Sequence, residues 1–182
     1  MRPVAQYGRI QVGLHHRHAE CDLHDRDFGM HGNWASTSLD GSMSGVAIHS
    51  TSVAHVRLTV TDIERSRQFY ESVFGWPVLL EVPDNANEAT RRQLDFLDGG
   101  VIYDLGGALV GLRPAASDRF DEDRVGLDHI AFRTASKAEL DEAAQHLDGL
   151  GIRHEPIKDI GPSYILEFRD PDNIALELTA PK

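Results

Sequence analysis

The chain has 182 residues, of which 41% are apolar and 26% charged, a length and composition suited to one globular domain or two small fused ones. It contains no apolar run approaching the roughly 18 residues that a membrane span requires. Its formal charge of -11 disfavours binding to phosphate backbones and anionic lipid, so we expect neither nucleic-acid nor membrane partners. A single cysteine, Cys21, excludes an internal disulfide and indicates a cytoplasmic protein.

Residues 1–50 differ in composition from the rest of the chain. They hold six of the ten histidines and few aliphatic residues, and they show neither amphipathic periodicity nor the features of an export signal. The sequence therefore predicts a disordered N-terminal extension, in preference to a metal-binding tract built from the histidines around Cys21. Met43 is an alternative natural start, which would make the preceding residues an over-extended reading frame.

A first structural unit is predicted from about residue 53 to residue 115. Residues 53–60 alternate between apolar and polar side chains, as expected of a half-buried strand. Thr61 and Glu64 have the spacing of a capping box, and the helical periodicity that follows ends at Gly75. Further strands are expected, bounded by glycine pairs, at residues 76–82, 93–97, 101–105 and 108–113.

The second half, from about residue 125 to residue 180, repeats this order. An apolar strand at 127–133 precedes a second capping box, Ser136 to Glu139, and a helix that ends near Gly149. Strands are expected at 152–157, 164–169 and 174–179, the last two joined by the turn 170–173. We therefore predict an α+β protein of paired βαβββ modules, in which curled mixed sheets surround a common cleft.

Strand parity places three potential metal ligands on the sheet faces that the helices leave uncovered. His55 and His129 alternate with apolar residues of the first strand in each module, and Glu177 alternates with leucines in the last strand. Two imidazoles and a carboxylate form the facial set associated with non-haem Fe(II), although Mn(II), Zn(II) or Ni(II) also suit these donors. The alternative is that both histidines are hydrogen-bonded strand residues and that Glu177 is solvated.

The motifs around these residues are similar to those of a known superfamily. HVRLTVTD at 55–62, GLDHIAF at 126–132 and FRDPDNIALE at 168–177 resemble the vicinal oxygen chelate superfamily, which includes glyoxalases, fosfomycin- and bleomycin-resistance proteins and extradiol dioxygenases. The resemblance covers residues 53–180. It implies paired βαβββ modules around a divalent metal-binding cleft, with His55, His129 and Glu177 as metal ligands.

The resemblance also implies a fourth ligand position near Gly111, where this chain has no donor. This departure argues against four-ligand glyoxalases and favours a metal-dependent dioxygenase-like enzyme, preferably with Fe(II), acting on a small oxygenated metabolite. Alternatives are a glyoxalase-like lyase, a fosfomycin-type thiol transferase, and a metal-free binding protein of the bleomycin-resistance type. A homodimer formed across sheet edges is compatible with this fold, although two modules in one chain suffice for a site.

Three further side chains are candidates for direct contact with a substrate. Glu167 shares the strand parity of the uncovered face and is a candidate general acid or base, the alternative being a surface glutamate on an edge strand. Arg57 and Arg133 have the parity of the two histidines, so each is suited either to a substrate carboxylate or to a salt bridge within the protein.

Overall fold

The computed structural model describes residues 50–182, which lie within the compact unit Ile48–Lys182. The predicted disordered extension, the histidine-rich tract around Cys21 and the alternative start at Met43 lie outside the described residues. None of the helices in the described part is long and apolar enough to cross a membrane.

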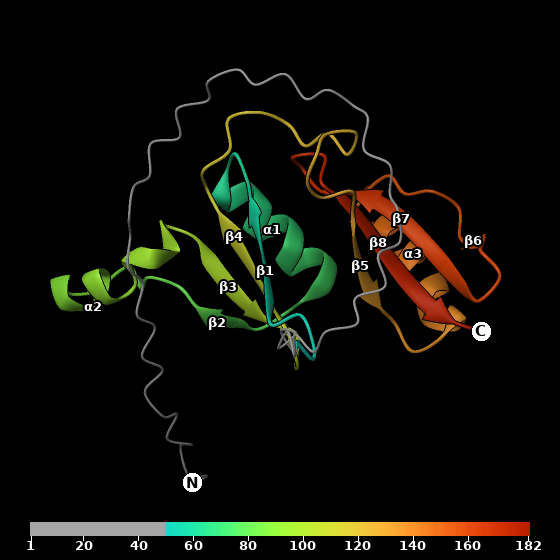
Figure 1. Ribbon diagram of the computed structural model, residues 1–182, viewed down its shortest axis with the longest axis horizontal. Coiled ribbons are helices and arrows are strands. Elements are labelled where there is room, and N and C mark those ends of the chain that lie inside the picture. Colours follow the sequence, from blue (N-terminus) through green and yellow to red (C-terminus); the bar gives the residue numbers. More distant parts are fainter. Residues whose placement is uncertain (1–49) are drawn as a thin grey trace, which may run out of the picture. The chain divides into compact units, whose positions relative to one another are not determined.

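The described chain contains two four-stranded sheets that share one topology (Figure 1). The first has the order β1-β4-β3-β2 and the second the order β5-β8-β7-β6. In each, the first strand of the module pairs in parallel with the last, and the other pairings are antiparallel. The predicted α+β class of paired βαβββ modules is confirmed.

The elements of the first module are β1 (His55–Thr59), α1 (Ile63–Phe74), β2 (Val78–Leu80), α2 (Glu88–Gln93), the 3₁₀ helix η1 (Asp95–Leu97), β3 (Val101–Asp104) and β4 (Leu109–Arg113). Those of the second are β5 (Ile130–Arg133), α3 (Lys137–Gly149), β6 (Lys158–Asp159), β7 (Ser163–Arg169) and β8 (Ala175–Pro181).

The two long helices begin at side-chain caps and end near glycines. Ser136 caps α3 by accepting from the Glu139 amide, as predicted. The predicted cap of α1 at Thr61 is wrong, because Asp62 is the N-cap and accepts from the Arg65 amide. At the other end of α1, Gly75 takes a left-handed conformation with φ of 62°, which a glycine adopts without strain.

Two predicted strands are absent from the described structure. Residues 93–97 were expected to form a strand, but they contain the end of α2 and the 3₁₀ helix η1. Helix formation starts here because the Asn87 side chain accepts from the Thr90 amide. Residues 152–157 contribute only an isolated bridge between His154 and Phe168, and the short edge strand β6 follows at Lys158–Asp159.

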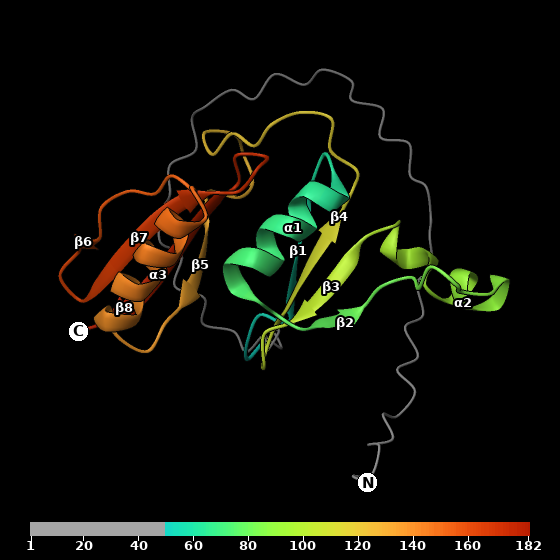
Figure 2. The ribbon, with the colours of Figure 1, turned by 180° about the vertical axis from the view of Figure 1, so that it is seen from behind.

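The helix-covered faces of both sheets contact one hydrophobic core. Phe74 of α1 packs against Phe132 of β5 with ring centroids 5.2 Å apart, and Trp76 lies between Phe132 and Tyr103 of β3. A single cluster of buried residues includes side chains from both sheets and both long helices. Figures 1 and 2 both show α1 between the strands of the first module and those of the second. The helix-covered faces of the two sheets thus share this core, and the uncovered faces lie outside it.

The turn between β7 and β8 also joins the modules. Asn173 donates its backbone N–H to the Asp170 carbonyl at 3.0 Å, which closes the predicted turn with Pro171 at its second position. The carboxylate of Asp172, on this turn, accepts from the amide and hydroxyl of Thr61 and pairs with Arg65. The start of α1 is thus held by a carboxylate more than one hundred residues away.

Candidate metal centre

The uncovered face of the second sheet brings two of the predicted ligands together. Glu177 of β8 lies beside Ala131 of β5 in the parallel register. His129 precedes Ala131 by two residues and therefore has the same parity. The proximity has an electrostatic consequence, since the charge of each of these two groups acts on the pKa of the other.

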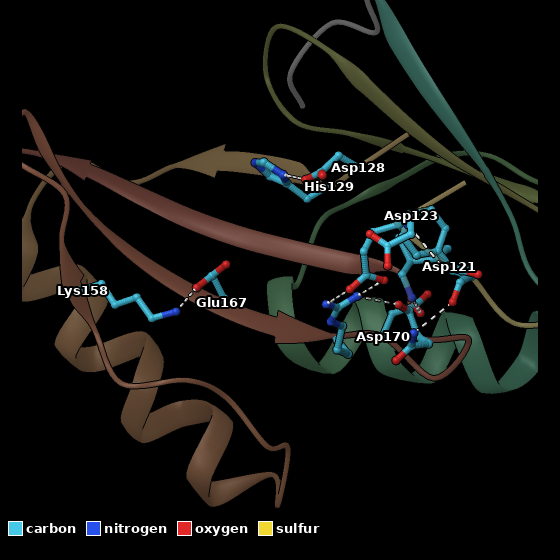
Figure 3. A network of polar contacts seen from close by, with 12 residues as sticks. Asp121, Asp123, Asp128, His129, Lys158, Glu167 and Asp170 are labelled. Carbon is cyan, nitrogen blue, oxygen red and sulfur yellow. Dashed lines mark hydrogen bonds and ion pairs between the residues drawn. The ribbon is translucent and has the colours of Figure 1, made fainter. Parts of the chain in front are cut away.

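A hydrogen bond to the preceding residue orients the His129 ring. The Asp128 carboxylate contacts Nδ1 of His129, as Figure 3 shows, which leaves Nε2 available to a ligand. This hydrogen bond raises the pKa of His129; partial burial opposes the effect, and the charges of Glu177 and Glu167 add to it. Asp128 thus contacts His129 in the way that carboxylates commonly orient a metal-binding imidazole.

Glu177 is half-buried, and it lies directly opposite Glu167 of β7 in the antiparallel register. Burial raises the pKa of Glu177 above its ordinary value; the charge of His129 opposes this, and the charge of Glu167 adds to it. Glu167 also accepts a hydrogen bond from Lys158 Nζ at 2.5 Å (Figure 3). The face therefore carries two neighbouring carboxylates, one imidazole and one ammonium group.

The first sheet has, on its own uncovered face, the positions that correspond to His129 and Glu177 of the second module. His55 is exposed at the start of β1, and Arg57, two residues later, pairs with Gly111 of β4. Since Ala131 pairs with Glu177 in the second sheet, the aligned histidines make Gly111 the structural equivalent of Glu177. The register therefore gives the same correspondence between Gly111 and Glu177 as the sequence, and glycine supplies no donor at this position.

A single copy of the chain does not assemble the three predicted ligands. His55 belongs to the first sheet, whereas Glu177 belongs to the second and His129 directly precedes β5 of that sheet, and the three residues do not form one group. Within residues 50–182, no group of three or more histidine, cysteine or acidic side chains is arranged to hold a metal ion. The donor types suit a divalent metal, but one copy presents only two of the three at one place.

Three contacts of the site could not be identified from sequence parity alone. Asp128 precedes His129 in the chain, and this adjacency was the only feature of the sequence that pointed to the contact between them. Lys158 reaches Glu167 through the pairing of β6 with β7, at a place where a different strand was expected. Arg57 donates to backbone carbonyls in η1, which was itself not predicted. Arg133 is exposed and has no carboxylate partner among residues 50–182.

Paired βαβββ modules with aligned histidines, at the start of β1 and directly before β5, define a duplicated α+β protein whose second sheet carries two of the three candidate metal ligands on one face. A sequence model of the Glyoxalase/Bleomycin resistance protein/Dioxygenase superfamily matches residues 52–178, and the chain belongs to this family. The Bacillus subtilis protein YwkD, whose function is uncharacterized, is 30% identical over 130 residues, which cover 70% of this chain and 94% of YwkD.

Solved structures agree with this assignment. A glyoxylase/bleomycin resistance protein/dioxygenase domain from Frankia sp. EAN1pec is 30% identical, with a TM-score of 0.60 over 74% of this chain and 100% of that domain. A lactoylglutathione lyase from Agrobacterium tumefaciens is 25% identical, with a TM-score of 0.54 over 72% of this chain and 94% of the lyase.

Proposed function

We propose that the chain is a metal-dependent enzyme that acts on a small oxygenated molecule, with His129 and Glu177 of one copy and His55 of a second copy as metal ligands. The observation that supports this most directly is the register. His129 and Glu177 lie on one uncovered face, and His55 has the equivalent position on the other. Equivalent positions that are separate within one copy can come together between two copies that pair with two-fold symmetry.

The proposed donor set has definite chemical consequences. Two imidazoles and one carboxylate occupy one side of a divalent ion, and this set favours Fe(II), with Mn(II), Zn(II) and Ni(II) as alternatives. When bound, such an ion supplies a Lewis acid for two substrate oxygens. Asp128 holds the His129 ring in the required orientation. Glu167, opposite Glu177 and hydrogen-bonded to Lys158, is the candidate acid or base for moving a substrate proton.

We favour oxidative chemistry of the dioxygenase kind, because the position equivalent to Glu177 in the first sheet is Gly111 and so leaves coordination sites open for substrate and dioxygen. A lyase is the second candidate, supported by the 25% identity to the Agrobacterium lyase. Two assays distinguish these candidates. A dioxygenase is expected to consume oxygen in the presence of Fe(II) and a dihydroxylated aromatic compound, whereas a lyase is expected to turn over a hemithioacetal without oxygen.

A subunit-mixing experiment tests the proposed site. The full chain, purified without a histidine tag, is loaded with Mn(II), and bound metal is measured by elemental analysis after gel filtration. Wild type is expected to bind about one ion per chain, and His55→Ala and Glu177→Ala each to bind little. Mixing and refolding the two variants together is expected to restore about a quarter of the sites, because each mixed dimer has one site with all three ligands.

Each alternative gives a different result. If all ligands came from a single chain, the mixed sample would remain as empty as its components. A wild-type chain that binds none of Fe(II), Mn(II), Zn(II) and Ni(II) would contradict the enzyme proposal and favour metal-free ligand binding of the bleomycin-resistance type. Arg133→Gln, on the same face of the second sheet, is the control and is expected to keep wild-type metal content.

A further inference from the structure

The side chain of Arg57 lies across the uncovered face of the first sheet. Its Nη1 donates to the Phe96 carbonyl at 2.9 Å, and its Nη2 donates to the Leu97 carbonyl. On the way it passes over Gly111, where an added Cβ would come within 3.2 Å of Arg57 Cγ. Arg57 therefore occupies the space that is left by the missing side chain at the position equivalent to Glu177.

The positive charge of Arg57 has no negative partner among residues 50–182. Most arginines of the described part pair with a carboxylate, namely Arg65, Arg67, Arg92, Arg113, Arg124 and Arg169. Arg57 instead contacts two neutral carbonyls, which fix its direction but do not neutralise its charge. A guanidinium has five N–H donors, and only two of these have acceptors here. The net charge of -11 repels anions at long range, but a fixed cation without a carboxylate partner, next to a candidate ligand, offers a local site for an incoming anion.

The surroundings leave room for such an anion. Arg57 is an exposed residue, and the hydrogen bond from its Nη1 to the Phe96 carbonyl lies at the surface of the protein. A glutamate in place of Gly111 would put a carboxylate beside the guanidinium and neutralise it. Glycine thus does two things at once: it removes a donor, and it leaves the Arg57 charge available.

We propose that Arg57 is a specificity-determining residue that binds a carboxylate of the substrate, so that the substrate is a small organic acid anion. The planar guanidinium suits this group because two parallel N–H bonds match its two oxygens. Arg57 follows His55 by two residues on the same face, so their Cα atoms lie roughly 7 Å apart along the strand, and the Arg57 side chain extends from there across Gly111. This spacing to a metal rests on the function proposed above; the anion site itself does not.

The anion site is tested on the full metal-free chain by titration with succinate, followed by backbone amide NMR. Saturable shifts are expected at Gly111, Leu97 and Asp98 in the wild type. Arg57→Gln is expected to weaken succinate binding by about tenfold or more. Arg91→Gln is the matched control, since Arg91 also donates only to backbone carbonyls but lies on α2. It is expected to leave the titration unchanged, and neutral succinamide is expected to cause no shifts.

A second arm links the anion site to the metal. On the Mn(II)-loaded chain, succinomonohydroxamate is expected to bind about tenfold more tightly than acetohydroxamate, and Arg57→Gln is expected to abolish this preference. Succinate shifts that are absent, or that persist in Arg57→Gln, would overturn the role of Arg57. Succinate binding at Arg57 in a chain that takes up no metal would overturn the proposed function and leave the anion site standing.

Discussion

Asp170 is a buried carboxyl group that accepts hydrogen bonds within the fold and has a raised pKa. It is 5% exposed, and its Oδ1 accepts from the amides of Asp172 and Ile174 while Oδ2 accepts from the Tyr70 hydroxyl. Burial raises the pKa of Asp170 to about 6, although these hydrogen bonds favour the ionised form. Burial next to this carboxylate also raises the pKa of Tyr70, so the phenol remains a donor at neutral pH.

Stability is expected to depend on pH through Asp170. The pKa of about 6 in the folded chain lies above the ordinary value of 3.8, so between these values the folded state holds a proton that the unfolded state has lost. Its contribution to the free energy of unfolding therefore falls as pH rises from about 4 to about 6, by roughly 2–3 kcal/mol. Asp170→Asn is expected to remove this component, because the amide does not titrate.

Urea unfolding of both proteins at pH 4.5, 5.5 and 7 measures the effect. The difference in stability between Asp170→Asn and wild type is expected to shift in favour of the variant as pH rises. Tyr70→Phe serves as control, because it removes one hydrogen bond but leaves the titrating carboxyl group buried. A stability difference that is constant over this range would contradict the assignment.

Residue parity was the most reliable guide to the candidate site. Leu58 and Val60 are buried and His55 and Arg57 exposed, as the alternation along the first strand predicts. Parity also placed His129 and Glu177 on one face. It could not indicate that His55 stays apart from them, because the direction of each face depends on which surfaces share the core. That choice is made by Phe74, Trp76 and other aromatic side chains, whose partners are distant in sequence.

Predictions for whole elements succeeded where periodicity was long and failed where segments were short. The helix Lys137–Gly149 and the strands Ser163–Arg169 and Ala175–Pro181 follow the sequence pattern closely. Residues 93–97 fit a strand equally well by composition, but the cap at Asn87 starts a helical segment before them. Such short apolar runs do not distinguish a strand from a helical turn.

The turn between β7 and β8 is expected to determine how firmly the two modules hold together. Asp172 has a nearly buried side chain that accepts three hydrogen bonds from Thr61 and Arg65. Asp172→Ala leaves these donors unpaired and is expected to lower the free energy of unfolding by roughly 3 kcal/mol. Asp172→Asn keeps an acceptor oxygen and is expected to cost about half as much.

The matched control for this prediction is Asp62→Ala. Asp62 caps the same end of α1 but is exposed and contacts only its own helix, so its loss is expected to cost about 1 kcal/mol. Chemical denaturation of the three variants gives the comparison. Equal costs for Asp172→Ala and Asp62→Ala would mean that the turn merely caps the helix and does not join the modules.

At the scale of the whole molecule, the core that the two modules share affects which metal ligands each uncovered face can offer. Because the helix-covered faces of both sheets are used for the core, each uncovered face is left with an incomplete set of donors. Residues 51–182 carry a net charge of -10, since the first fifty residues contribute four basic and five acidic side chains to the total of -11. Two copies that approach each other therefore repel, and a divalent cation between their faces offsets part of this repulsion.

Metal binding and dimer formation are therefore expected to be linked. An ion that needs ligands from two copies binds the dimer and not the monomer, so Mn(II) at one hundred times its dissociation constant is expected to tighten the dimer by at least about a hundredfold. Sedimentation velocity with and without Mn(II) measures this shift. His55→Ala and Glu177→Ala are each expected to abolish the metal effect while keeping the metal-free equilibrium, and Arg133→Gln is expected to retain it. Stoichiometric Mn(II) on a chain that stays monomeric would show that one copy completes the site through a rearrangement of its two sheets.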